Sequence, residues 1–389
     1  MFFLCHFFVV DKGKEVGNVT LNESFELGCG LVLKNRVLFA PISTLSCLPG
    51  GEISEQDLAF YEKRSKGVGA IVLASAYVTQ KGKAYEGGIG ISHNRHIAGL
   101  SKLISKIKKG GSDSKVFIQL YHGGAMTSYN STIRSSFCVS SESNQLDSTH
   151  QYQELTEQMI ESIYQDYEEA LIRAIRAGFD GVEIHAASNY LPYQFLSPSW
   201  NYRTDAYGGC LKKRLKFIEE LVLRLNSCIN EYATSPFALG IRLSETDSSL
   251  EEQEKWKSFQ TTLLTVQELN SLPLDYIHMA SSDSLEEVEV DGQKYSKASL
   301  LNTMSDSIPL ITCGGLLCHE DVAKALKTSP LVSACRPFIF LPDWAEKVLV
   351  GTEIVFEERQ LTGALRQELA IPRALWSSVK ESKEWYMYQ

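Results

Sequence analysis

Short apolar runs recur along the chain at intervals that predict a series of buried strands. Each run is nearly continuous in apolar residues, as strands covered on both faces must be. The eight runs are 36–41, 69–78, 115–122, 179–186, 237–244, 274–281, 309–315 and 331–340. Helix-like segments separate most of them, so strand and helix alternate along the chain.

Two of the intervening segments have clear helical periodicity. From Thr156 onward apolar residues fall on one stripe at helical spacing, and Gly178 follows where a C-terminal cap is expected. Residues 211–232 repeat this pattern. Strands alternating with helices over about 300 residues predict an α/β fold, a single (β/α)8 TIM barrel. A doubly wound open sheet is the alternative, but no Gly-x-Gly-x-x-Gly run follows the first strand.

The remaining segments are assigned around one barrel domain, residues 19–350. Residues 1–18 begin with an apolar stretch too short to span a bilayer and without the charged start of a signal peptide, so we expect a loosely packed or disordered extension. Residues 19–33 predict a hairpin that closes the barrel floor, and 123–155 form a polar insertion. Residues 351–389 predict a helical tail that packs on the barrel or on a partner subunit.

Composition and charge narrow the function classes. The 389 residues are 44% hydrophobic and carry a formal net charge of −9, so nucleic acid and anionic membranes are poor candidate partners. Nine cysteines are scattered without a Cys-x-x-Cys pair, which predicts reduced thiols in a cytoplasmic protein and no metal site. The expected ligands are therefore small molecules.

Polar residues and glycines gather where the predicted strands end. In a barrel of this kind the carboxyl ends of the strands meet at one face. Those ends carry Ser43, Ser75, Gln119, His122, His185, Arg242, Ser281, Gly314, Gly315 and Arg336. The paired glycines let backbone N–H groups approach an anion and Arg336 offers a guanidinium fork, so the last two strands predict a phosphate site.

Several of these runs, taken together, are similar to a known family. They are "NRVLFAPIS" (35–43), "ASA" (74–76), "IQLYHGG" (118–124), "AGFDGVEIHAA" (177–187), "YLPYQFLSPSWNYRTDAYGG" (190–209), "IRLS" (241–244), "CGG" (313–315) and "CRPF" (335–338). From about residue 20 to about residue 350 the chain resembles the Old Yellow Enzyme family of FMN-dependent oxidoreductases, specifically its bacterial NADH:flavin oxidoreductase branch.

The resemblance implies a non-covalent FMN across the barrel mouth, reduced by NADH or NADPH. The residues implied to contact the flavin ring are Ala40, Pro41, Ile42, Ser43, Ala74 and Gln119. Arg242 is implied near N1 and the C2 oxygen, where a positive charge stabilises the reduced flavin. The residues implied to hold the phosphate are Gly314, Gly315, Cys335 and Arg336.

The resemblance also implies hydride transfer through FMN to activated C=C bonds of enones, to quinones or to flavin. His185 would donate a hydrogen bond to the acceptor oxygen, and Tyr190 would deliver a proton to carbon. The family has histidine or asparagine where this chain has Ser188, and glycine where it has Asn189, so either side chain is a candidate second donor. Leu45 replaces a tyrosine of close bacterial relatives and makes the pocket more apolar.

Two alternatives remain open at this point. Serine at position 188 motivates a flavin-binding module with lost or altered reductase activity. A homodimer or homotetramer is possible, with the aromatic tail as a contact.

Three other polar groups have structural interpretations: His122 supports the flavin site, Arg203 with Asp205 fixes a loop, and Glu183 satisfies a partner inside the barrel.

Overall fold

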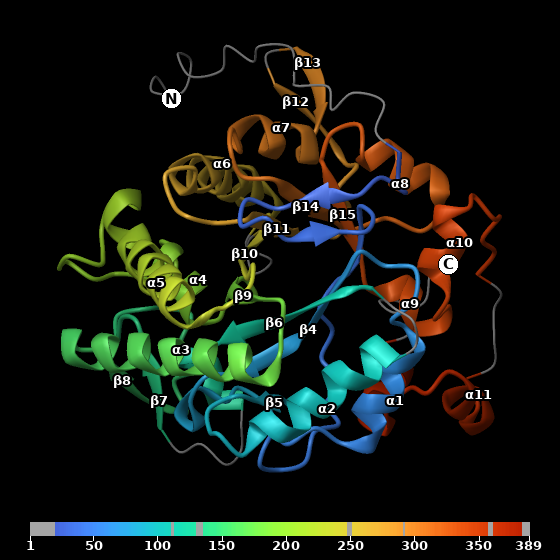
Figure 1. The fold of residues 1–389 in the computed structure, drawn as a ribbon. Coiled ribbons are helices and arrows are strands. Elements are labelled where there is room, and N and C mark those ends of the chain that lie inside the picture. Colours follow the sequence, from blue (N-terminus) through green and yellow to red (C-terminus); the bar gives the residue numbers. More distant parts are fainter. Residues whose placement is uncertain are drawn as a thin grey trace.

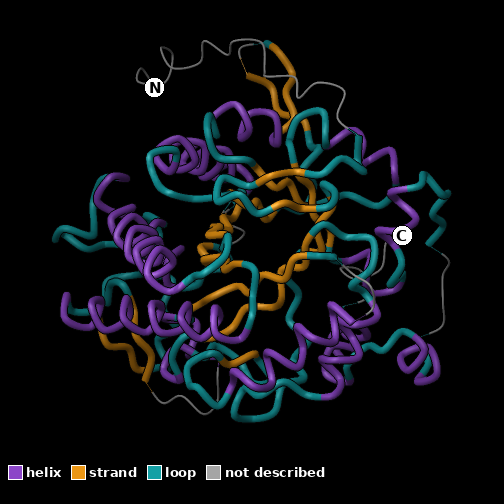
Figure 2. The backbone as a smooth tube through the Cα atoms, in the orientation of Figure 1, coloured by secondary structure: helices purple, strands orange, loops and turns teal. Residues whose placement is uncertain are grey.

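Eight parallel strands close into a barrel in the computed structural model, which describes residues 20–109, 113–129, 135–246, 251–290, 292–356 and 361–382. Around the barrel they run β3, β4, β6, β9, β10, β11, β14 and β15, and β15 pairs with β3 to complete the circle. Figures 1 and 2 show the ring of strands with helices outside it. The predicted (β/α)8 barrel is confirmed. The expected extension, residues 1–18, lies outside the described residues.

Each of the eight apolar runs contains one barrel strand. The strands are β3 (Val37–Phe39), β4 (Ala70–Tyr77), β6 (Lys115–Tyr121), β9 (Gly181–Ala186), β10 (Ala238–Ser244), β11 (Tyr276–Ala280), β14 (Leu310–Cys313) and β15 (Leu331–Ala334). The last run differs from the prediction, because after β15 the chain enters helix α9 (Arg336–Phe340). Pro337 lies in the first turn of α9, where its missing N–H costs no hydrogen bond.

The helices that return the chain between strands bury one face against the barrel. They are α1 (Glu55–Lys63), α2 (His96–Lys109), α3 (Glu157–Ala177), α5 (Leu211–Tyr232), α6 (Glu252–Leu269), α7 (Lys297–Met304), α8 (His319–Ala325) and α10 (Trp344–Leu349). The Thr156 side chain accepts a hydrogen bond from Met159 N–H at the start of α3, and Gly178 ends the helix with a left-handed φ of 93°. Both helices predicted from periodicity are therefore confirmed.

The predicted hairpin closes the floor of the barrel. Strands β1 (Phe25–Glu26) and β2 (Val32–Leu33) pair antiparallel. Leu27, Leu31 and Leu33 are buried against the apolar residues at the amino ends of the barrel strands, including Phe117 and Tyr276. The lower half of the barrel interior is thus a packed apolar core, as is usual for this fold.

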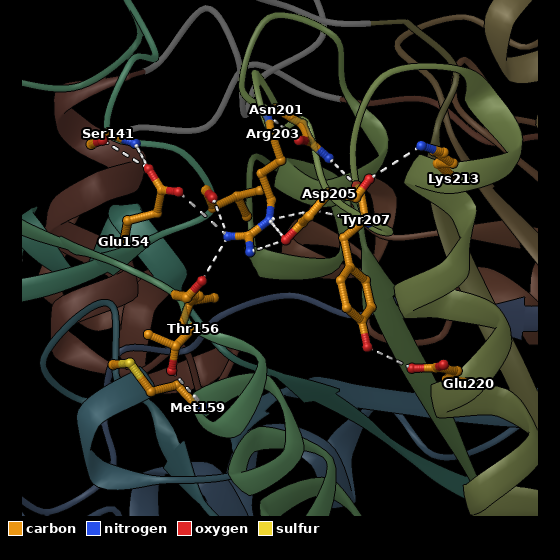
Figure 3. A network of polar contacts seen from close by, with 12 residues as sticks. Ser141, Glu154, Thr156, Met159, Asn201, Arg203, Asp205, Tyr207, Lys213 and Glu220 are labelled. Carbon is orange, nitrogen blue, oxygen red and sulfur yellow. Dashed lines mark hydrogen bonds and ion pairs between the residues drawn. The ribbon is translucent and has the colours of Figure 1, made fainter.

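The polar insertion after the third strand is held in part by one arginine. It contains η2 (Gly124–Tyr129) and the parallel pair β7 (Ser135–Cys138) and β8 (Gln151–Glu154). Arg203 donates to the carbonyl oxygens of Val139 at 2.9 Å and Leu155 at 2.6 Å, and it forms an ion pair with Asp205 (Figure 3). The loop-fixing interpretation of Arg203 and Asp205 is confirmed.

The remaining elements of the described chain are short. They are η1 (Gln80–Gly82), β5 (Ile89–Gly90), α4 (Leu191–Leu196), β12 (Glu287–Val290), β13 (Gln293–Ser296), α11 (Gly363–Glu368) and α12 (Arg373–Glu381). Within residues 361–382, Trp376 is buried and Arg373 N–H donates to Gln56 of α1, so this part of the tail packs on the barrel's own helices. No helix in the described part of the chain is long and apolar enough to cross a membrane.

A buried guanidinium joins α1, α9 and the tail. Arg64 has no exposed surface, and its nitrogens donate to the carbonyl oxygens of Phe60, Phe338, Ile339 and Leu369 at 2.8–3.0 Å. Burial lowers the pKa of Arg64 to about 9, so it remains charged at neutral pH. Carbonyl oxygens from three separate parts of the chain therefore depend on one side chain.

Replacing Arg64 with methionine should lower the free energy of unfolding by about 3 kcal/mol, because buried carbonyl oxygens lose a charged donor. Urea denaturation followed by circular dichroism measures the change. The matched control is Arg95→Met, which removes an exposed arginine paired with Glu52 and should cost less than about 1 kcal/mol. Equal losses in the two variants would contradict the assignment.

Candidate active site

A cavity opens at the carboxyl ends of the barrel strands, where the sequence predicted polar residues to meet. Side chains from six consecutive strands line it. They are Pro41, Ile42, Ser43, Ser75, Gln119, His185, Ser188, Tyr190, Arg242 and Ala280. The structure therefore brings together residues separated by more than 200 positions, because parallel strands in a closed barrel end at the same face.

Three residues that the resemblance places at the flavin ring or the acceptor are not among those that line this cavity. Ala40 is buried where its N–H donates to Ala334 O, and Asn189 is likewise not among the lining residues. The pairing of β4 with β6 shifts register between Leu73 and Ser75, and Ala74 packs in the core between strands and helices. Successive strand residues point to opposite faces, so the side chain that β4 contributes to the cavity belongs to Ser75 and not to Ala74.

His185 is a buried, neutral imidazole. It is 7% exposed, and its Nδ1 has no hydrogen-bond partner among the described residues. Burial, with the nearby positive charge of Arg242, lowers the pKa of His185 to about 3. The ring can therefore offer one N–H to a molecule in the cavity without carrying a charge.

Tyr190 stands beside His185 and keeps its proton at neutral pH. The two rings are perpendicular, with centroids 4.8 Å apart, and Tyr121 supports the other side of Tyr190 at 4.7 Å. Burial raises the pKa of Tyr190 well above its usual value. The phenol is thus a proton donor held in position by two neighbouring rings.

The turn that carries these residues is held by Gln194 of α4, which is fully buried. Its Nε2 donates to Asn189 O at 2.6 Å and Gly123 O at 3.1 Å, while its Oε1 accepts from Ala125 N–H. Ser188 and Asn189 both have left-handed backbones, with φ of 55° and 57°. Of the two candidate second donors, Ser188 lines the cavity.

The next two strand ends form a backbone cradle suited to phosphate. Gly314 and Gly315 follow β14 with φ of 117° and 73°, and a Cβ on Gly314 would lie 2.4 Å from Ser281 O. Cys335 and Arg336 follow β15 at the start of α9. The left-handed backbone at Gly314 and Gly315 favours glycine, and the guanidinium of Arg336 lies on the neighbouring strand end, so these two strand ends fit an anionic group. The cavity lined by the polar side chains fits a flat heterocycle.

The sequence analysis missed Tyr85. Its hydroxyl lies 2.9 Å from Ser43 Oγ and 3.2 Å from Ser75 Oγ, and its ring is nearly parallel to Tyr121 at 6.0 Å. Tyr85, Tyr121, Tyr190 and His185 therefore form one row of rings beside the cavity. Tyr85 sits in a glycine-rich loop after β4, and only that loop composition could have drawn attention to it.

Glu183 has the structural role expected of it, and the support of the flavin site by the buried His122 stays a prediction. His122 is fully buried, accepts from Gly124 N–H at 3.0 Å, and burial lowers its pKa to about 3. Glu183 lies inside the barrel and accepts from Gln119 Nε2 at 2.6 Å.

Comparison with known proteins decides the family. A sequence profile of the NADH:flavin oxidoreductase / NADH oxidase family matches residues 21–353. The chain belongs to this family.

Two curated relatives show how far the likeness extends. The chain is 32% identical over 373 residues to the probable NADH-dependent flavin oxidoreductase YqiG of Bacillus subtilis (strain 168), covering 95% of this chain and 98% of that protein. It is 32% identical over 357 residues to the NADH:acrylate oxidoreductase of Vibrio harveyi, covering 89% of this chain. The chain spans only 34% of the length of that second relative.

Solved structures agree on the fold. Morphinone reductase superposes with a TM-score of 0.71 at 24% identity, covering 90% of this chain and 93% of that one. The Old Yellow Enzyme homologue from Zymomonas mobilis gives a TM-score of 0.71 at 20% identity, covering 87% and 95%. The resemblance noted in the sequence is confirmed, and this NADH:flavin oxidoreductase family member is an FMN-dependent NAD(P)H oxidoreductase.

His185 should stay neutral from pH 5 to pH 8, because its pKa is lowered to about 3 and the charged form appears only below that value. Nitrogen-15 NMR of histidine-labelled protein measures this, with the His185→Gln variant assigning the signal. A titration midpoint between pH 5 and pH 8 would show that the ring is not buried as described.

Proposed function

We propose that the enzyme passes hydride from NADH or NADPH through FMN to an acceptor with an activated C=C bond, to a quinone or to free flavin. The observation that carries the proposal is the pairing of a neutral, unpartnered imidazole with a protonated phenol in one cavity. Two relatives named for NADH-dependent reduction of flavin and of acrylate, a conjugated alkene, support the reaction class.

The side chains present fit FMN in one orientation. Pro41, Ile42, Ser43 and Ser75 would face the ring from β3 and β4, with Gln119 and Arg242 at its polar edge. The phosphate would lie at Gly314, Gly315, Cys335 and Arg336. When bound, FMN supplies the hydride-accepting and hydride-donating centre, and the protein supplies orientation and charge.

His185 would stabilise the charge that develops on the acceptor. An N–H aimed at a carbonyl oxygen draws electrons from the conjugated double bond and stabilises the enolate oxygen that forms as hydride arrives. The ring is buried, so this hydrogen bond is stronger than it would be in water. Ser188 lines the same cavity and would supply the second hydrogen bond.

Tyr190 would complete the reduction of an alkene. Addition of hydride to one carbon leaves its neighbour in need of a proton, and a phenol that keeps its proton at neutral pH can give it. Its orientation is fixed by the edge of His185 and the face of Tyr121. A quinone acceptor is protonated on oxygen and does not require this step.

The proposal is tested with purified protein loaded with FMN under anaerobic conditions. NADH or NADPH should bleach the yellow absorbance, and an added enone should restore it with one product formed per flavin. Bound FMN that is not bleached by either nucleotide would instead favour a flavin-binding module without reductase activity.

Replacing His185 with alanine should leave FMN binding unchanged and lower enone turnover by about 100-fold, which is the scale of losing one oxyanion donor. FMN retention is read from the absorbance of the purified variant, and turnover from nucleotide oxidation. Unchanged turnover would show that another group holds the acceptor oxygen.

Replacing Tyr190 with phenylalanine should slow flavin reoxidation by an enone by about 100-fold or more and leave reoxidation by a quinone nearly unchanged, because only the enone needs a carbon protonated. Stopped-flow absorbance measures both half-reactions on the same preparation. Tyr121→Phe removes a hydroxyl that accepts from Ala84 N–H outside the cavity and is the matched control. Equal slowing with both acceptors would contradict the proton-donor role.

A further inference from the structure

The barrel interior directly beneath the cavity is polar, in contrast to its apolar floor. Glu183 on β9, His278 on β11 and Ser333 on β15 come from alternate strands and are fully buried. Side chains from alternate strands form one layer of a barrel core, and such layers are normally apolar. Burying charged and polar groups at this depth costs free energy, so we expect this polar layer to serve a function.

Hydrogen bonds join the groups of this layer. Glu183 accepts from Gln119 at 2.6 Å, and its other oxygen lies 2.8 Å from His278 Nδ1. Burial opposes ionisation of Glu183, but the positive charge and hydrogen bonds of its neighbours prevail and lower its pKa. An ionised carboxylate only accepts, so His278 Nδ1–H donates to it, and His278 Nε2 lies 2.8 Å from the Ser333 hydroxyl.

The guanidinium of Arg242 contacts His278, and it makes no direct ion pair with Glu183. Its NH1 lies 3.3 Å from His278 Nε2 and 3.5 Å from Nδ1, and the register of β10 with β11 sets the two residues side by side. Among the described residues Arg242 has no carboxylate oxygen within 4.0 Å. His278 therefore contacts both Glu183 and Arg242, and Arg242 lines the cavity.

The positive charge of Arg242 lowers the pKa values of two neighbouring groups. Burial would raise the pKa of the Cys313 thiol, but hydrogen bonding to His278 and the charge of Arg242 bring it down to about 7. The same charge, after burial, contributes to the low pKa of His185.

We propose that His278 is a positioning residue that holds Arg242 apart from Glu183, and that the balance between these two charges sets the reduction potential of FMN. The inference rests on the proposed placement of the flavin ring beside Arg242. A positive charge at that edge stabilises reduced flavin, and a buried negative charge behind it opposes this effect.

Two substitutions in the same layer should move the two-electron midpoint potential in opposite directions. Glu183→Gln keeps the shape and removes the negative charge, so the potential should rise. His278→Ala lets Arg242 approach Glu183, so the potential should fall. Each shift should correspond to about a tenfold change in the reduction equilibrium, which is about 30 mV for a two-electron couple. Equilibration of the FMN-loaded variants with a reference dye at pH 7 measures both.

A milder variant and a control complete the experiment. Ser333→Ala removes the hydroxyl that steadies His278 and should lower the potential by less than His278→Ala does. Thr312→Val alters a buried β14 residue whose hydroxyl has no partner among the described residues, and it should leave the potential unchanged.

The outcomes separate this inference from the proposed function. Wild-type protein that holds no FMN would overturn both. Wild-type protein that holds and reduces FMN, with shifts of the same sign in Glu183→Gln and His278→Ala or with none, would overturn only the role of His278. If neither variant retains FMN, Ser333→Ala decides, and an unchanged potential there also overturns the role.

Discussion

Hydrogen bonding of β3 to both β4 and β15 is the constraint on which the site depends. Once the ring of strands is closed, every strand ends at the same face, and side chains as far apart in sequence as Pro41 and Ala280 line one cavity. The hairpin beneath and the apolar layer it covers fix the barrel from below. Above it, Gln194 and Arg203 hold the loops by donating to backbone carbonyls, so the side chains that line the cavity are held in place.

Charge is distributed so that each group at the cavity has one state at neutral pH. His185 is neutral because it is buried near Arg242, and Tyr190 is protonated because its surroundings disfavour a phenolate. The charges and hydrogen bonds of its neighbours lower the pKa of Glu183. Under the proposed function an acceptor would meet an uncharged donor, a proton source and a cation in a fixed arrangement, so little reorganisation would be needed during the reaction.

The strands and the two longest helices were predictable because apolar periodicity reports directly on burial. Local geometry overrides that pattern at two places. The irregular register of β4 puts Ser75 at the cavity, so the contact of Ala74 with the flavin ring stays a prediction, and the last apolar run continues into α9 with Pro337 in its first turn. Tyr85 escaped notice because an aromatic residue in a loop has no periodicity to reveal it.

The sequence by itself determined the alternation of buried strands and helices, the glycines and arginine after the last two strands, and the run from His185 to Tyr190, because these depend on residue type and on neighbours close in the chain. Only the tertiary structure decided which of Ser188 and Asn189 lines the cavity, which rings support Tyr190, and that His278 contacts both Arg242 and Glu183. Those facts depend on distances between strands nearly 100 residues apart, and the closure of the barrel alone sets such distances.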